Sequence, residues 1–320
     1  MKTRLPRLAV FLLAGGSIAA LLADLYGLAP MHIVFWFVSV PSMIVLAVAA
    51  TLPRVDPDLR ARIRVGAVAG LAGLVGYDVV RVPVALTGQR VFAPIETYGL
   101  LIADAAFSSP LTSTLGWLYH LSNGVTFGIA FAVLFARRPV LFGVAWGLFL
   151  ETVALLSPFA DRYGLSGRLV PIVIALGAHV FYGWPLGYLV RHFDRTAAAL
   201  PRLRVTATLA LAVAVVLAWQ QPWNVPADQR LAGALSRPGA PVTIVRTDRF
   251  HPEWLRIRPG ACAYVDNRST VTFTTPAGPV PAGARSPLCF ADPGIYRIRL
   301  TTRPYSGGFV YVDAVTRQPR

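Results

Sequence analysis

The hydrophobic positions form long apolar blocks up to about residue 220 and short alternating runs from about residue 237. Blocks of about 20 apolar residues match the thickness of a bilayer core, and in lipid only helices satisfy their own backbone hydrogen bonds. The first region therefore predicts a membrane all-α bundle of about seven transmembrane helices. The expected spans are 8–28, 31–52, 65–86, 111–136, 139–158, 169–190 and 205–220. The first block follows a basic N-terminus, so a cleaved signal peptide is the alternative for it.

The C-terminal region alternates apolar and polar positions, as strands with one buried face do. Tyr296, Ile298 and Leu300, for example, alternate with Arg297 and Arg299. Repeated Pro-Gly and Pro-Ala-Gly turn signals separate such runs, which favours a small all-β sandwich. We therefore expect a transmembrane domain at 1–220, a linker at 221–236 and a β-sandwich at 237–320.

Four stretches of this region resemble a cupredoxin domain: 254–260, 264–267, 290–296 and 307–312. The resemblance implies a cupredoxin-like fold. Cupredoxins hold copper with two His, a Cys and usually a Met, but the His expected after Asn267 is absent, and Val271 and Thr272 occupy that region. The Cys expected after Tyr296 is also absent, near Leu300. The resemblance thus implies the fold without a copper site.

Both cysteines of the chain, Cys262 and Cys289, fall in this β region. On the oxidising side of a membrane such a pair usually forms a disulfide. The alternative is a two-thiolate metal site, although the nearest histidine, His251, is not close in sequence.

The distribution of basic residues predicts the orientation of the chain in the membrane. Only 14% of the residues are charged, yet the formal net charge is +15. With the N-terminus inside, 13 basic residues fall in cytoplasmic segments and three in the opposite loops, as the positive-inside rule requires. We expect a multi-pass protein of the cytoplasmic (inner) membrane with a periplasmic or extracellular C-terminal domain. Topology then accounts for the cytoplasmic share of the basic charge, which would also lie against anionic lipid headgroups, and no nucleic-acid partner is expected. The basic residues of the C-terminal region are expected on a solvated sheet face, with a basic docking patch as the alternative. The three outer basic residues are Arg90, Arg162 and Arg168.

Ionisable residues occur inside four of the expected spans, where an unpaired charge costs several kcal/mol. At about 1.5 Å per residue they fall in one layer, about 8–15 Å below the outer surface. Five ionisable groups at one depth predict a shared site. They are Asp78 and Arg81 in the third span, His120 in the fourth, Glu151 in the fifth and His179 in the sixth.

Three of these residues head a stripe of glycines at four-residue spacing, on one helix face. Small residues at this spacing let membrane helices approach closely. The His-x3-Gly-x3-Gly pattern occurs in two parallel spans, which indicates a duplicated helix pair. The stripes are His120–Gly124–Gly128, His179–Gly183–Gly187 and, in an antiparallel span, Gly143–Gly147–Glu151.

Imidazole and carboxylate together suit zinc, iron or another transition metal. We therefore expect His120, His179 and Glu151, with Asp78 as a fourth ligand, to bind such a metal. Two alternatives stay open: buried His–Glu and Asp–Arg pairs that fix helix register, or a pathway for protons or a substrate. The residues expected to flank and orient the ligands are Arg81, Asn123, Tyr119, Tyr182 and Tyr77.

Three functions are compatible with this sequence, and no specific reaction can be predicted from it. The first is metal handling or metal-dependent chemistry near the outer leaflet, beneath a loop at 90–110 that could fold back as a lid. The second is haem binding, with His120 and His179 as axial ligands. The third is a non-catalytic membrane anchor whose β-domain binds a protein or small-molecule partner. Lys2 is the only lysine, which excludes a retinal Schiff base within the helices, and phosphate-loop, serine-elbow and Cys-x-x-Cys motifs are absent.

Overall fold

The computed structural model describes residues 4–87, 91–201, 227–237, 240–246, 249–275, 278–300 and 303–314. These residues form two compact units. The helical unit comprises Met1–Val91, Leu118–Phe159 and Leu165–Gln221, and the β-containing unit comprises Phe92–Trp117, Ala160–Gly164 and Pro222–Arg320. The expected span at 205–220 lies outside the described residues.

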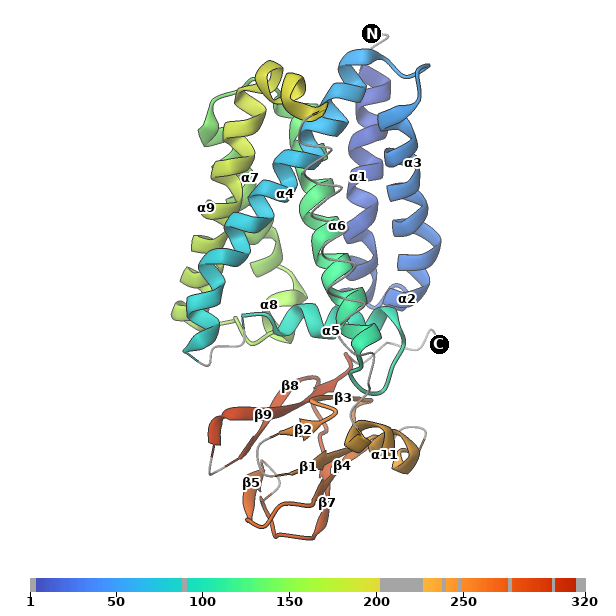
Figure 1. Cartoon of the computed structure of the whole chain (residues 1–320), viewed down its shortest axis with the longest axis vertical. Coiled ribbons are helices and arrows are strands. Elements are labelled where there is room, and N and C mark those ends of the chain that lie inside the picture. Colours follow the sequence, from blue (N-terminus) through green and yellow to red (C-terminus); the bar gives the residue numbers. More distant parts are fainter. Residues whose placement is uncertain are drawn as a thin grey trace. The chain divides into compact units, whose positions relative to one another are not determined.

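Long apolar helices make up the helical unit (Figure 1). Five described helices are long and apolar enough to cross a membrane, and Val140–Leu155 is a shorter apolar helix. The helical N-terminal part and the β-rich C-terminal region are therefore as expected. The helices are α1 (Arg4–Leu25), α2 (Met31–Val34), the π-helical turn η1 (Phe35–Ser39), α3 (Val40–Thr51), α4 (Pro57–Leu86), α6 (Pro110–Phe135), α7 (Val140–Leu155) and α9 (Leu169–Arg191).

Facing glycines bring the helices into backbone contact. A Cβ on Gly128 of α6 would overlap backbone atoms of Gly66 and Gly70 in α4. A Cβ on Gly183 of α9 would likewise overlap the backbone of Gly143 in α7. The close approach predicted from the glycine stripes is therefore present in both helix pairs.

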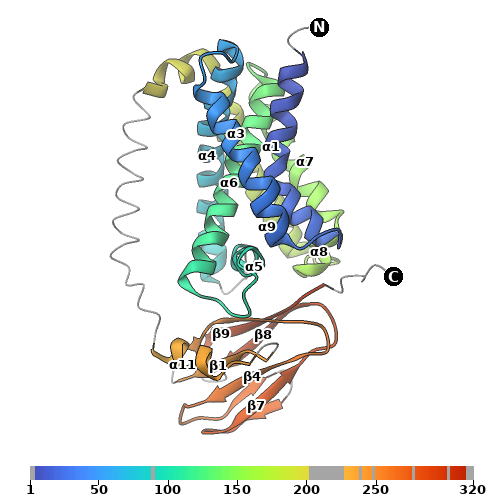
Figure 2. The same ribbon diagram turned by 90° about the vertical axis from the view of Figure 1, so that its right-hand side faces the viewer.

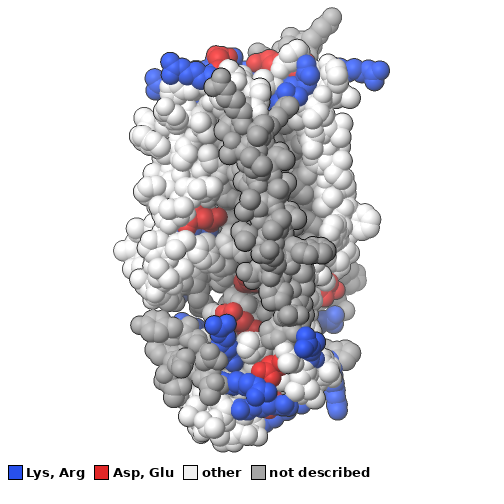
Figure 3. Space-filling view, viewed as in Figure 1, with Lys and Arg blue, Asp and Glu red and all other residues white. Residues whose placement is uncertain are grey.

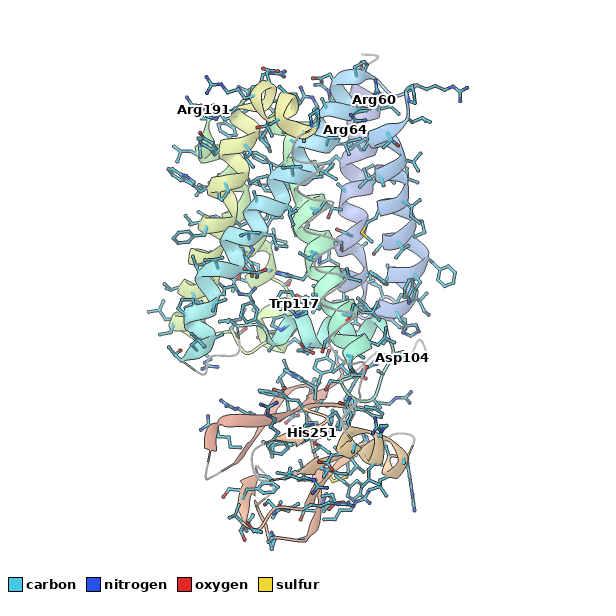
Figure 4. The ribbon with its side chains drawn as sticks, in the orientation of Figure 1. Arg60, Arg64, Asp104, Trp117, Arg191 and His251 are labelled. Carbon is cyan, nitrogen blue, oxygen red and sulfur yellow. A yellow bond between two sulfur atoms is a disulfide. The ribbon has the colours of Figure 1, made fainter. Side chains whose placement is uncertain are left out.

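Basic side chains gather at one end of the helical unit. Arg60, Arg64 and Arg191 lie at this end (Figure 4), where Arg137 also pairs with Asp194 at 2.6 Å. Figure 3 shows a nearly uncharged surface along the helices, interrupted on that face by one small acidic patch. This distribution suits helices that are surrounded by lipid along their length.

The strands of the β-containing unit form two layers, which Figure 2 shows edge-on. One sheet has the order β2-β1-β4-β7 and the other β3-β9-β8, with β5 and β6 as a separate pair. β1 runs parallel to β4 and β3 parallel to β9, while the other pairs are antiparallel. The strands are β1 (Val242–Val245), β2 (Phe250–His251), β3 (Trp254–Ile257), β4 (Cys262–Asn267), β5 (Phe273–Thr275), β6 (Gly278–Val280), β7 (Arg285–Cys289), β8 (Gly294–Leu300) and β9 (Arg303–Val312).

Alternating apolar residues from the sheets fill the core of this unit, among them the fully buried Leu255, Val265 and Leu288. The expected disulfide between Cys262 and Cys289 is present. At the other end of β4, the Asn267 amide donates hydrogen bonds to the carbonyl groups of Val271, Val280 and Pro281 at 2.9, 3.0 and 3.0 Å. One buried amide therefore organises the turn after β4. A short amphipathic helix, α11 (Ala227–Leu235), precedes the first strand.

The loop expected at 90–110 contains a helix, α5 (Ala93–Ile102), which the sequence pattern did not indicate. Its residue Leu100 is fully buried with Trp254 and Phe309 of the β region. The segment that follows extends the edge of β3, because Ser108 N donates to the Trp254 carbonyl at 2.9 Å and Arg256 N donates to the Ala106 carbonyl at 2.8 Å. The loop is thus part of the β-containing unit.

Candidate intramembrane His–carboxylate site

The first His–carboxylate pair joins α4 to α6. Nε2 of His120 lies 3.1 Å from each carboxylate oxygen of Asp78. Arg81, one helical turn beyond Asp78, donates from its guanidinium to Asp78 Oδ1 at 3.2 Å. The side chains of Arg81 and His120 are only 7% and 12% exposed. Asp78 is therefore engaged through both oxygens, by one permanent cation and one imidazole.

The second pair joins α7 to α9. Nδ1 of His179 lies 3.1 Å from Glu151 Oε2 and 3.0 Å from the carbonyl oxygen of Ala175. The Glu151 side chain is 6% exposed. Its other oxygen, Oε1, is buried and has no hydrogen-bond partner among the described residues. Glu151 therefore has one engaged and one unsatisfied oxygen, unlike Asp78.

Tyr77 of α4 connects the two pairs. Its ring centroid lies 5.9 Å from that of His120 and 4.8 Å from that of His179. The guanidinium carbon of Arg81 lies 4.5 Å from the Tyr77 centroid, which is cation–π distance. The same ring thus contacts both imidazoles and the buried cation. Together, the six side chains form one continuous polar layer.

The two pairs occupy equivalent places in two similar helix pairs. His120 lies one and two turns before Gly124 and Gly128, as His179 does before Gly183 and Gly187. In each pair these glycines contact the helix that supplies the carboxylate. Gly128, Gly183 and Gly187 meet backbone atoms of that helix, whereas Gly124 meets the side chain of Leu74. This arrangement agrees with the predicted duplication. A hydrogen bond of 2.8 Å from the Tyr182 hydroxyl to the Gly124 carbonyl links one helix pair to the other.

The predicted metal ligands come together as two pairs and not as one cluster. Each carboxylate lies 3.1 Å from a ring nitrogen of one histidine, and Tyr77 contacts both imidazoles. Across the described residues, no group of three or more His, Cys, Asp or Glu side chains is placed to hold a metal ion. Metal binding by His120, His179, Glu151 and Asp78 therefore stays a prediction, and the paired geometry does not favour it.

The residues predicted to flank the ligands take different places. Arg81 pairs with Asp78 as expected, whereas Tyr182 binds a backbone carbonyl. Tyr119 is fully buried and its ring contacts Phe35 edge-on at 5.8 Å. Oδ1 of the buried Asn123 has no hydrogen-bond partner among the described atoms.

Sequence reasoning missed a second polar group in the bundle. The hydroxyls of Ser17 and Thr126 lie 2.6 Å apart, and the Ser39 hydroxyl donates to the Gly16 carbonyl at 2.7 Å. All three hydroxyl residues are at most 3% exposed. These bonds join α1 to α6 and to the π-helical turn. Hydroxyl residues are common in apolar helices, so nothing in the sequence singled out these three.

The chain was compared with protein-family models, with curated proteins and with solved structures. No family model matches it, and neither does any curated protein or solved structure.

Proposed function

We propose that the helical unit passes protons across the membrane and that, of its two His–carboxylate pairs, Glu151–His179 transfers the proton. One observation carries this proposal: two imidazole–carboxylate pairs, each with a nitrogen–oxygen distance of 3.1 Å, lie in one layer of the bundle, and a single tyrosine ring contacts both imidazoles. Ionisable groups inside membrane helices are costly, and where they occur they commonly form relays or ion pathways. A proton relay needs only paired donors and acceptors. It does not need the convergent ligands that a metal requires.

The two pairs suit different tasks in such a relay. Asp78 is held by Arg81 and His120, so its charge is compensated within the protein. Within the described part of the chain, Glu151 contacts one histidine and its Oε1 has no hydrogen-bond partner, so we assign to this oxygen the uptake and release of a proton. Imidazole is the side chain best suited to exchange protons near neutral pH. Protons would then pass between Glu151 and His179, while Asp78 and Arg81 hold a fixed charge pair.

The test is proton flux into liposomes that contain the purified protein and a trapped pH-sensitive dye, with a potassium diffusion potential as driving force. We expect the parent protein to acidify the lumen and the variants Glu151→Gln and His179→Gln to lose this flux. His192→Gln is the matched control, because His192 Nδ1 also bonds the carbonyl four residues earlier, at 2.9 Å, but lies at the end of α9. A parent flux equal to that of protein-free liposomes would refute the proposal.

Transition-metal handling is the second candidate. The paired geometry of the four residues does not favour it, and it rests on the orientation of His179 alone. A metal-bound histidine commonly donates its second ring N–H to a carbonyl or carboxylate. His179 Nδ1 faces both the Ala175 carbonyl and Glu151, which leaves Nε2 as the ligand atom. Elemental analysis of the detergent-purified parent beside a His120→Ala/His179→Ala variant tests this candidate. About one equivalent of zinc or iron, lost in the variant, would establish it, and the absorption spectrum of the same sample tests haem.

We further propose that residues 205–220 form a seventh span, with the N-terminus in the cytoplasm and the β region outside. The basic residues at one end of the bundle and the disulfide of the β region support this orientation. Protease treatment of intact spheroplasts tests it, because a C-terminal tag would be removed while an N-terminal tag stays protected. Loss of the N-terminal tag alone would show the opposite orientation and contradict the proposal.

For the β region we propose a cupredoxin-like sandwich that does not bind copper. Its two layers and its mixture of parallel and antiparallel strand pairs support the fold. The turn after β4, where the resemblance places one missing ligand, is organised by the Asn267 amide instead. Titration with copper and measurement of bound metal test this, and stoichiometric copper in the β region would contradict it.

A further inference from the structure

The disulfide of the β-containing unit lies on the outer surface of a sheet. Cys262 in β4 and Cys289 in β7 are directly opposed in the antiparallel ladder. Along β4 the residues alternate between half-buried and buried, and Cys262 belongs to the half-buried set with Tyr264. Cys289 is exposed on β7, which is the edge strand of its sheet. Solvent therefore reaches this disulfide, and more directly at Cys289.

The core beneath these strands does not include either sulfur atom. Ala263 and Leu288 are paired neighbours of the two cysteines, face inward and are fully buried. They belong to the apolar cluster that joins both sheets. Four further residue pairs continue the β4–β7 ladder beyond the disulfide. Opening the S–S bond therefore exposes no core residue and leaves the rest of the ladder in place.

We propose that Cys262–Cys289 is a reversible disulfide that exchanges with a dithiol on the same side of the membrane. Exposed disulfides are the labile ones, whereas buried structural disulfides resist exchange. The thiolate of the incoming dithiol attacks Sγ of Cys289, which is the exposed sulfur, and Cys262 leaves as a thiolate. The second thiol of the dithiol then attacks the mixed disulfide, so that the incoming molecule is oxidised to its disulfide. Cys262 and Cys289 are reduced, and each takes up one proton.

The test uses the full-length protein in detergent and dithiothreitol as the dithiol. Samples are equilibrated in buffers of graded reduced-to-oxidised dithiothreitol ratio, quenched in acid and alkylated with a maleimide that shifts gel mobility. We expect both cysteines to become modified under native conditions, with unchanged near-ultraviolet circular dichroism. A protein that gains the label only after a denaturant is added would show that the disulfide is structural, and the proposal would fail.

Single variants identify the sulfur that is attacked. Cys262→Ser leaves Cys289 as a free thiol, and Cys289→Ser leaves Cys262. With oxidised glutathione as the probe, we expect mixed disulfide to form several-fold faster at Cys289, because it is the more exposed residue. Equal rates in the two folded variants, or faster reaction at Cys262, would overturn the assigned direction of attack. Circular dichroism of both variants confirms that the comparison is between folded proteins.

Discussion

Replacing Asp78 by Asn tests whether the two carboxylates of the polar layer differ in charge compensation. Asp78 accepts a hydrogen bond from Arg81 at 3.2 Å, and the Arg81 side chain is 7% exposed. The variant keeps the size of the side chain but leaves the Arg81 charge without its nearest counter-ion. Removing one partner of a buried ion pair costs about 3–5 kcal/mol. The cation–π contact with Tyr77 remains, so we expect the lower end, about 3 kcal/mol.

Glu151→Gln provides the comparison. Among the described residues this carboxylate has one partner, His179, and one unsatisfied oxygen. Glutamine keeps the size of the side chain and an oxygen beside His179, whose Nδ1 remains within hydrogen-bond distance of the Ala175 carbonyl, and the substitution leaves no cation without its nearest partner. We therefore expect a loss below about 1 kcal/mol, the net value of one neutral hydrogen bond.

Reversible unfolding in mixed micelles with increasing denaturing detergent, followed by circular dichroism, gives the free energies of both variants. The double variant Asp78→Asn/Arg81→Gln should recover about 2 kcal/mol of the loss, because it also removes the cation that Asp78→Asn separates from its nearest counter-ion. Equal costs for Asp78→Asn and Glu151→Gln would refute the assigned asymmetry. A double variant less stable than Asp78→Asn alone would show that Arg81 stabilises the bundle through contacts other than Asp78.

Three further predictions concern packing and pH. Gly183→Ala should cost about 1–3 kcal/mol because its Cβ meets the α7 backbone, whereas Gly177→Ala on the same helix, where a Cβ has open space, should cost nothing in the same unfolding assay. Leu255→Ala should destabilise the β region by about 2–5 kcal/mol, measured by urea unfolding against the exposed control Val271→Ala. Burial raises the pKa of Glu96 above its usual 4.5, against a hydrogen bond from Ser113. Its ionisation therefore weakens the fold as pH rises through the raised pKa, so Glu96→Gln should increase the melting temperature at neutral pH and leave it unchanged below pH 4.5.

The sequence predicted the polar layer because helical periodicity is a local property. Residues four apart share a face, so the glycine stripes already placed His120 and His179 toward close helix contacts. The depth of each residue within its span then placed the charged groups at one level. Pairing depends instead on how the helices lie side by side, which one sequence does not encode locally. The predicted single cluster was therefore resolved into Asp78–His120 and Glu151–His179.

Helix α5 shows a second limit of local reasoning. Its residues Ile95, Leu100 and Ile102 are at most 2% exposed, although the segment is too short for a span and follows no strong amphipathic pattern. Trp254 and Phe309, more than 150 positions later in the chain, are part of its apolar surroundings. The burial of this segment depends on partners that are distant in sequence, so its local sequence alone predicts an irregular loop and not a buried helix.

The two helix pairs have similar backbone contacts but differ in how the charge of the carboxylate is compensated. Both use glycine contacts to bring a histidine-bearing helix against a carboxylate-bearing one, so the backbone gives the two carboxylates equivalent places. Only the first pair has an arginine one turn beyond the carboxylate, and only the second leaves a carboxylate oxygen unsatisfied. Register alone would be fixed equally well by two compensated pairs. A bundle that compensates one charge fully and the other in part keeps one site able to change its protonation state, and this asymmetry favours proton transfer over a purely structural role.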